Sequence, residues 1–267
     1  MIYGLVTVDY EDYLKEIDKV NAPKNVINPT KNIMTFFESF DVPVTFFCNV
    51  PEYMAYRDNG HEHFSLYEKQ IKDIVNRGHD IQLHFHPEWL SYEWDGNKWC
   101  DRSGIKYGVE KINLEEYKDD LMECVSILRG FSNDIFVYRG GGYQIEPLER
   151  NSKILSELGI KIDSSIRVRT MPLPYNAGNG ILEVPIYYHG KFRWDMSSGP
   201  GNVNIIEKII SEYKNYKHDI FLVMMGHCKQ HVYYGKLKKM MNNLDSGLIK
   251  FITFKDIMEL IDKGDTE

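Results

Sequence analysis

Two histidines separated by a single residue, His84 and His86, have a spacing that would let both bind one metal ion. They close the segment 78–87 (GHDIQLHFHP), which reads as a β-strand ended by a proline. Side chains of a strand alternate between its faces, so both imidazoles lie on one face and the apolar residues on the other. Zinc binds histidine nitrogens and keeps one position open for water when it is catalytic. The alternative is a pair of surface histidines on an edge strand, and the pair alone leaves both interpretations open.

Three carboxylates follow the apolar run 2–8 near the start of the chain: Asp9, Glu11 and Asp12. One carboxylate and two histidines would complete a three-ligand catalytic metal site, and a second carboxylate could act as general base on the water. For Glu11 and Asp12, an acidic cluster favoured by a helix dipole is the alternative. The residues themselves leave open which carboxylate joins the histidines.

Three more polar clusters end predicted strands: Arg139, Asp163-Ser164-Ser165 and His227. Arg139 precedes three glycines and could lower the pKa of a catalytic carboxylate as its charge partner. His227 ends the apolar strand that starts at Ile220, where it could serve as general acid. An ordinary arginine before a flexible turn and an ordinary loop histidine are the alternatives. The carboxyl ends of parallel barrel strands all lie at the same end of the barrel, so five polar strand ends together predict an active site there.

Strands and helices alternate along most of the chain, and several strands are apolar throughout, as in a parallel sheet covered by helices. Asn28, Ser65 and Asn113 are the predicted N-caps. Neither a Gly-x-Gly-x-x-Gly nucleotide fingerprint nor a Walker loop is present. We therefore expect one α/β domain over 1–267, a barrel of seven or eight strands rather than an open sheet. Strands are expected over 2–8, 44–50, 78–86, 135–138, 160–162, 182–187, 220–225 and 251–253, and helices over 28–40, 65–75, 113–130, 147–158, 205–216, 232–244 and 255–263.

A long loop over 88–111 carries Trp89, Trp94 and Trp99. Loops of this length inside a domain are typically functional or disordered, and three tryptophans argue against disorder. These indoles, like Tyr143 after the glycines, could stack on a sugar ring or pack the loop.

The composition of the chain argues against several classes of partner and of site. The 267 residues are 43% hydrophobic and carry a net charge of −7, which argues against a nucleic acid or an anionic membrane as main partner. The four cysteines are scattered and form no zinc or disulfide pattern, so we expect free thiols. With no signal-peptide pattern and no run long enough to span a membrane, the expected location is the cytoplasm.

In chain order, these motifs resemble the polysaccharide deacetylase superfamily, carbohydrate esterase family 4. The resemblance covers nearly the whole chain. The matching motifs are Thr7-Val8-Asp9-Tyr10-Glu11-Asp12, Gly78-His79-Asp80-Ile81 with His84-Phe85-His86-Pro87, Arg139-Gly140-Gly141-Gly142-Tyr143, Asp163-Ser164-Ser165 and Met225-Gly226-His227.

The resemblance implies a distorted (β/α)7 barrel that holds zinc or a similar divalent ion and removes the acetyl group from an acetamido sugar. The implied roles are Asp9 as general base, His227 as general acid, Arg139 orienting Asp9, Asp163 supporting that network, Glu11, His84 and His86 as metal ligands, a backbone N–H near Tyr143 in the oxyanion hole, and Trp89 and Tyr143 at the substrate.

Two spacings differ from the family pattern. The family's histidines have three residues between them, and its two acidic residues are adjacent, whereas Tyr10 here separates Asp9 from Glu11. A spacing of two keeps both members of each pair on one side of a strand. The leading hypothesis is a metal-dependent N-deacetylase of a sugar precursor in surface-glycan assembly. The alternatives are a small-molecule amidohydrolase, with or without metal, and a catalytically silent sugar-binding protein.

Overall fold

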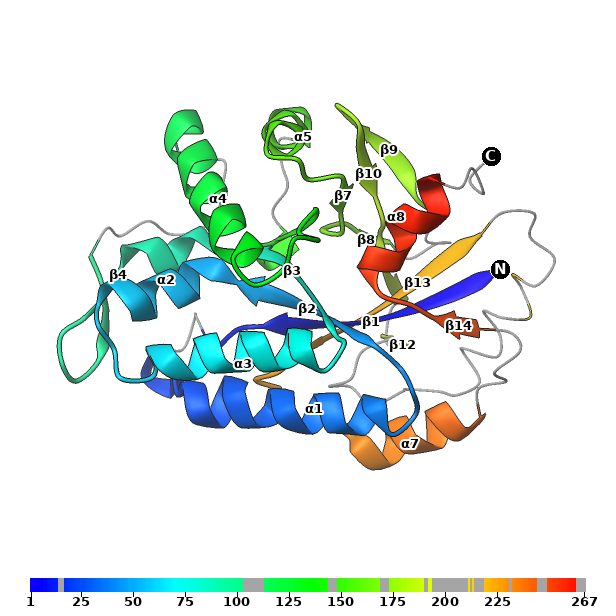
Figure 1. Cartoon of the computed structure of the whole chain (residues 1–267), viewed down its shortest axis with the longest axis horizontal. Helices are drawn as coiled ribbons and strands as arrows, with labels where there is room; N and C mark the ends of the chain where they lie inside the picture. Colours follow the sequence, from blue (N-terminus) through cyan, green and yellow to red (C-terminus); the bar gives the residue numbers. More distant parts are fainter. Residues whose placement is uncertain are drawn as a thin grey trace.

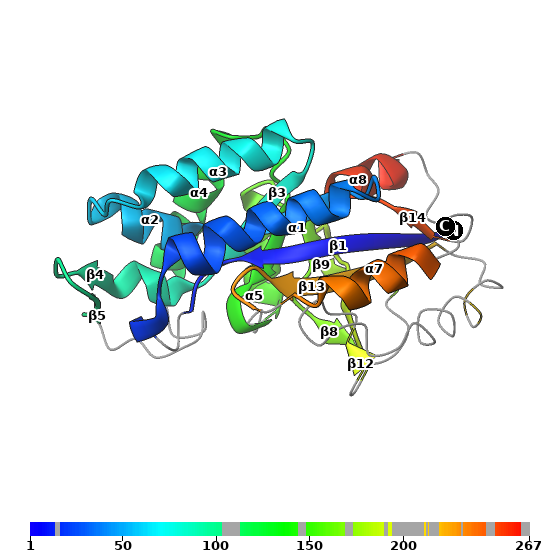
Figure 2. The ribbon, with the colours of Figure 1, turned by 90° about the horizontal axis from the view of Figure 1, so that it is seen from below.

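A largely parallel β-sheet forms the centre of the chain, and helices lie along its outer face (Figures 1 and 2). The structure is a computed structural model that describes residues 1–13, 17–102, 113–143, 148–168, 173–189, 192–193, 211, 213, 219–230, 232–243 and 249–262.

The strands of the main sheet are β1 (Ile2–Tyr10), β2 (Val44–Asn49), β3 (Asp80–Phe85), β6 (Val137–Gly140), β7 (Ile162–Asp163), β8 (Arg167–Val168), β9 (Tyr175–Gly178), β10 (Ile181–Glu183), β11 (Ile186–His189), β12 (Phe192–Arg193), β13 (Ile220–His227) and β14 (Ile249–Phe251). A separate hairpin joins β4 (Tyr92–Trp94) to β5 (Trp99–Asp101). The α-helices are α1 (Asn28–Glu38), α2 (Val50–Asp58), α3 (Phe64–Asn76), α4 (Leu114–Arg129), α5 (Leu148–Glu157), α7 (Tyr234–Asn243) and α8 (Phe254–Asp262). Short helical turns are η1 (Ile17–Lys19), η2 (Pro23–Ile27), η3 (Pro87–Ser91) and η5 (Gly141–Tyr143).

The sheet curls into a barrel. β13, β1, β2, β3, β6 and β7 lie side by side in this order, and every pair is parallel. β10 pairs with β7, and β11, which follows it after Val184 and Pro185, pairs with both β8 and β13. Within the described residues, β11 meets β13 at the single register pair Ile186–Val223, so this seam is narrow. The predicted distorted (β/α)7 barrel is confirmed.

The alternation along β1 divides the core in two. All nine residues of β1 are buried, which explains its almost continuous apolar sequence. Tyr3 and Leu5 belong to the cluster inside the barrel, which α8 closes at one end with Phe254 and Ile257. Ile2, Val6, Val8 and Tyr10 belong to the larger cluster between the sheet and the outer helices. The inner face continues from Leu5 to Thr7 and Asp9, and the barrel interior therefore turns from apolar to polar towards the strand ends.

Several local expectations are corrected. Asn28 is not an N-cap, because the turn of π-helix η2 runs directly into α1 and both flanking residues are helical. Ser65 is not one either, since α3 starts at Phe64 and no side chain caps it. Asn113 does cap α4, accepting a hydrogen bond from the Glu115 N–H. Helix α2 was not predicted, and part of the predicted long loop is the β4–β5 hairpin. Most of the helix expected over 205–216 lies outside the described residues.

None of the helices that the structure describes has the length and apolar character needed to cross a membrane.

Two carboxyl groups are buried side by side between β7 and β10. Asp163 and Glu183 are register partners and have no exposed surface. One oxygen of each is occupied, since Asp163 Oδ1 accepts from Ser165 Oγ (2.5 Å) and Glu183 Oε1 accepts from the Ile166 N–H (3.0 Å). Burial raises the pKa of Asp163 to about 7, and burial together with the adjacent Asp163 raises the pKa of Glu183 to about 10. The pair therefore retains protons that an unfolded chain releases near pH 4.

This retention predicts a loss of stability as the pH rises. Below about pH 4 the two carboxyl groups are protonated in both the folded and the unfolded state, so their ionisation does not change the free energy of unfolding. Above it the unfolded state ionises first, so the free energy of unfolding falls up to the folded pKa values, about 7 and about 10. Glu183→Gln cannot ionise and keeps an acceptor for Ile166. We expect it to be more stable than the parent by on the order of 2 kcal/mol at pH 8.5 and by much less at pH 5, measured by urea unfolding.

Glu62→Gln is the control, because the Glu62 side chain is 84% exposed. A Glu183→Gln effect of equal size at both pH values would contradict the protonated pair.

Candidate functional site

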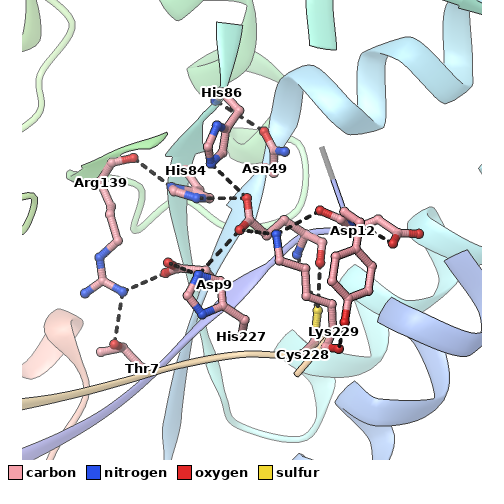
Figure 3. A network of polar contacts seen from close by, with 12 residues as sticks. Thr7, Asp9, Asp12, Asn49, His84, His86, Arg139, His227, Cys228 and Lys229 are labelled. Atoms are coloured by element: carbon pink, nitrogen blue, oxygen red, sulfur yellow. Dashed lines mark hydrogen bonds and ion pairs between the residues drawn. The ribbon is translucent and has the colours of Figure 1, made fainter. Parts of the chain in front are cut away.

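The predicted polar strand ends meet at one end of the barrel (Figure 3). In the sheet, Asp9 is the register partner of His227 across β1 and β13, and His84 is the register partner of Arg139 across β3 and β6. Parallel pairing thus sets Asp9 beside His227 and His84 beside Arg139, while Glu11 and His86 come from the residues just beyond β1 and β3.

Glu11, His84 and His86 form a three-residue group that could hold a metal ion. Glu11 Oε2 lies 3.3 Å from His84 Nε2 and 2.9 Å from His86 Nε2. A second such group joins Asp9, Glu11 and His227. Of the three carboxylates left open by the sequence, Glu11 is the one that faces both histidines of the pair.

The proton positions around His84 favour a cation at this place. Its Nδ1 lies 2.9 Å from the Arg139 carbonyl oxygen, which can only accept, so Nδ1 carries the hydrogen. In the neutral ring Nε2 is then an acceptor, and it faces Glu11 Oε2, another acceptor. Both atoms are buried, and neither has a hydrogen-bond partner in the described part of the chain. Two buried acceptors facing each other without a proton are the donor set of a metal site, and imidazole with carboxylate suits zinc.

His86 is oriented by its surroundings as well. Its Nδ1 lies 3.3 Å from Glu88 Oε2, and its backbone N–H donates to Asn49 Oδ1 (3.3 Å). Burial lowers the pKa of His86, but Glu11 and Glu88 together raise it by more, so that the pKa is about 10. The surroundings of the imidazole therefore strongly favour a positive charge.

Arg139 is the partner of Asp9, as predicted. Its Nη1 donates to Asp9 Oδ1 (2.8 Å) and to Thr7 Oγ1 (3.0 Å), although its side chain is completely buried. Its guanidinium carbon also lies 3.7 Å from the centre of the Phe47 ring. Burial alone would raise the pKa of Asp9, but Arg139 and the nearby histidines lower it below its usual value. Asp9 is therefore ionised at neutral pH.

His227 is the most accessible of these groups. Its side chain is 18% exposed, whereas those of Asp9 and Glu11 are 4% exposed. His227 Nε2 lies 3.5 Å from Asp9 Oδ2 and 3.6 Å from Glu11 Oε1, too far for firm hydrogen bonds. Its ring therefore borders the site from the solvent side, where a substrate would approach.

Asp12 points away from the histidines. Its carboxylate accepts from the N–H groups of Tyr13 and Asn21 (2.7 Å each) and from Asn25 Nδ2 (2.7 Å). These bonds hold the segment that follows β1, and burial raises the pKa of Asp12. Asp12 therefore has a structural role.

Asp163 does not contact Arg139 in any hydrogen bond or ion pair of the described residues, so its predicted support is indirect. Ser164 instead accepts from Arg139 with its carbonyl oxygen (3.0 Å) and its hydroxyl (3.2 Å). Ser165 Oγ connects Asp163 to the backbone N–H of Gly140 (2.8 Å). Asp163 thus positions the segment that holds Arg139, rather than acting at the reacting atoms.

The substrate role predicted for Trp89 is wrong in this structure. Trp89 has no exposed surface, and its ring packs against Tyr56, Tyr92 and Trp99 with centroids 5.4–6.3 Å apart. A buried indole offers no face to a sugar, and packing explains its position. The side chain of Tyr143 lies outside the described residues.

Three residues at the site were missed from the sequence: Asn49, Glu88 and Lys229. Asn49 is the polar end of the apolar strand β2, so the strand-end argument could have found it. Glu88 and Lys229 follow His86 and His227 by two positions. Lys229 Nζ donates to Glu11 Oε1 (2.8 Å). Burial raises the pKa of Glu11, but Lys229 and His86 lower it far more, well below its usual value.

Gly141 is required by the close approach of His86. A Cβ atom at position 141 would lie 2.4–2.6 Å from atoms of the His86 ring, which is much closer than real contacts. We expect Gly141→Ala to displace the ring and to weaken zinc binding by about 10- to 100-fold, with the far-UV circular dichroism unchanged. Isothermal titration with zinc measures the effect.

Gly235→Ala in α7 is the matched control, since a Cβ there meets nothing within 4 Å. Zinc affinity in Gly141→Ala equal to that of the control would mean that His86 is not a ligand.

The chain is similar in fold to several solved structures. No protein-family model matches the sequence, and no curated protein matches it significantly. Among solved structures, one described as a polysaccharide deacetylase from Mycobacterium smegmatis has a TM-score of 0.65 at 15% identity, over 100% of this chain and 92% of that chain. One so described from Pseudomonas aeruginosa PAO1 has a TM-score of 0.60 at 13% identity, over 100% and 92%. The allantoinase PuuE has a TM-score of 0.60 at 14% identity, over 97% and 88%. The chain therefore has the polysaccharide deacetylase fold.

Proposed function

We propose that this protein is a metal-dependent hydrolase that removes the N-acetyl group from an amino sugar. The observation that carries the proposal is the convergence of two buried acceptors without a proton, Glu11 Oε2 and His84 Nε2, beside His86 and an ionised Asp9. The fold, shared with solved structures described as polysaccharide deacetylases, supports the choice of reaction.

Glu11, His84 and His86 would hold the ion, with zinc the best match to two imidazoles and a carboxylate. A divalent ion there supplies Lewis-acid polarisation of the amide carbonyl and activation of water. The Arg139 carbonyl and Glu88 orient the two imidazoles so that each Nε2 faces Glu11.

Asp9 is suited to accept the proton of the attacking water. It is ionised, and Arg139 holds one of its oxygens while the other faces His227. A carboxylate with a lowered pKa is a weak base, so the water must be made more acidic by its surroundings. His227, at the accessible edge, is suited to protonate the departing amine.

The proposed substrate is an N-acetylated sugar or glycan precursor of surface-polysaccharide assembly. Acetate release from N-acetylglucosamine, its 1-phosphate, a nucleoside-diphosphate derivative and a chitin oligosaccharide would rank the carriers. A small-molecule amidohydrolase is the second candidate, because the allantoinase PuuE shares the fold. Turnover of allantoin that survives exhaustive chelation, with no acetate released from any sugar, would establish that candidate instead.

Removing both histidines tests the metal site. We expect zinc in His84→Ala/His86→Ala, measured by elemental analysis after dialysis, to fall from about one ion per chain to background, with loss of acetate release. His63→Ala is the control, because the His63 side chain, at the start of α3, is 29% exposed and belongs to neither candidate metal group. Full acetate release in the double variant would rule out the metal-dependent reaction.

Asp9→Asn separates proton transfer from metal binding. We expect kcat for acetate release to fall by about 10²- to 10⁴-fold while zinc stoichiometry stays unchanged, because Asp9 is outside the Glu11–histidine group. Undiminished sugar binding combined with no turnover in the parent protein would instead indicate a silent binding protein.

A further inference from the structure

Hydrogen bonds join the residues that follow β13 to those that follow β1, directly beside the site (Figure 3). Cys228 Sγ lies 3.3 Å from the Glu11 carbonyl oxygen and 3.4 Å from its N–H. Lys229 Nζ donates to Glu11 Oε1 (2.8 Å) and to the Asp12 carbonyl oxygen (2.9 Å), and Tyr13 donates its hydroxyl to the Lys229 carbonyl (2.9 Å). Glu11 is thus held from its backbone to its carboxylate by residues that follow His227.

We propose that Lys229 is a positioning residue that binds one oxygen of Glu11, so that the other is presented to the ion as a single-oxygen ligand. The inference rests on the proposed metal site and adds to it a lysine as the charge partner of the ligand carboxylate. Lys229 occupies Oε1, while Oε2 faces His84 and His86 and has no hydrogen bond in the described part of the chain. The two oxygens of Glu11 therefore have different partners.

The ion pair is buried, which distinguishes it from a surface salt bridge of little consequence. The Lys229 side chain is 14% exposed and that of Glu11 is 4% exposed. A buried carboxylate that loses one of its cations is destabilised, because little water reaches it and His86, 2.9 Å from Oε2, is then left to compensate it. Lys229 therefore stabilises Glu11 when no ion is present.

The same charge must oppose a divalent ion. Asp9 already has its own cation, Arg139, so the ammonium of Lys229 is the positive charge bonded to the metal-facing carboxylate. A positive charge within a few ångströms repels the ion, and at an effective dielectric constant near 20 or above this is worth on the order of tenfold in affinity or more. Lys229 thus stabilises the metal-free protein and weakens metal binding, which leaves the bound ion a stronger Lewis acid.

A purely structural role for Lys229, fastening β13 to β1, has a different consequence. Loss of such a contact lowers the stability of the metal-free and the zinc-loaded protein alike. Loss of a charge partner lowers the stability of the metal-free protein alone, because zinc then compensates Glu11. The difference in melting temperature between the two forms therefore separates the two roles.

The test compares the parent with Lys229→Met, which keeps the aliphatic chain and removes the charge. Melting temperatures are measured by calorimetry without metal and at a fixed excess of free zinc, and zinc dissociation constants by competition with a chromophoric chelator. We expect Lys229→Met to melt lower than the parent without metal, to show a larger zinc-induced rise, and to bind zinc about tenfold more tightly.

Two further variants serve as controls. Lys229→Arg keeps the positive charge and should behave like the parent. Lys24→Met removes an exposed lysine that lines the same surface pocket as Lys229, and it should change neither the zinc-induced rise nor the dissociation constant.

Equal or weaker zinc binding in Lys229→Met, with an unchanged zinc-induced rise, would overturn the role of Lys229 and leave the metal site intact. Absence of zinc binding in the parent would overturn the metal site and the role of Lys229 together. Because binding and melting are measured, neither result depends on knowing the substrate.

Discussion

The buried guanidinium of Arg139 is the group on which the rest of the site depends. A completely buried positive charge is tolerated only when it is paired and its N–H groups are satisfied. Here Thr7 and Asp9 of β1 and Ser164, which follows β7, satisfy it. The backbone carbonyl of the same residue orients His84. One residue of β6 therefore fixes both the ionised carboxylate on β1 and the tautomer of the histidine on β3.

The barrel interior explains how such a polar centre coexists with a stable fold. The half of the interior next to α8 is filled by apolar side chains. The half at the carboxyl ends of the strands carries polar groups on the same inward-facing positions, because each strand continues its alternation to the end. Hydrophobic burial next to α8 stabilises the barrel, so the carboxyl ends of the strands can hold charges that contribute to chemistry rather than to packing.

Charge at the site is arranged as pairs. Asp9 is matched by Arg139 and Glu11 by Lys229, each at 2.8 Å. The Nε2 atoms of the two imidazoles then face the second oxygen of Glu11, where an ion would be bound. Deeper in the sheet, Asp163 and Glu183 have no cation within hydrogen-bond distance in the described residues, and burial raises their pKa values to about 7 and about 10. Carboxyl groups of similar burial thus have pKa values shifted in opposite directions, because their neighbours differ.

The sequence by itself determined the barrel and the strand ends at which the site lies. Apolar runs of strand length separated by helical patterns predict a parallel sheet, and the alternation of side chains places His84 and His86 on one face of their strand. These are local properties, since a period of two depends only on the chain within one strand. Parallel strands end at a common edge, so the residues predicted Arg139 as the charge partner of a carboxylate there, and the family resemblance implied that this carboxylate is Asp9.

Only the tertiary structure decided which side chains complete the site. Glu11 rather than Asp12 faces the histidines because Asn25 and backbone N–H groups hold Asp12. Trp89 is buried because three other aromatic rings surround it, and Ser164 rather than Asp163 contacts Arg139. Lys229 reaches Glu11 from 218 residues further along the chain. Such choices are competitions among partners distant in sequence, and the energies that decide them exist only once the chain has folded.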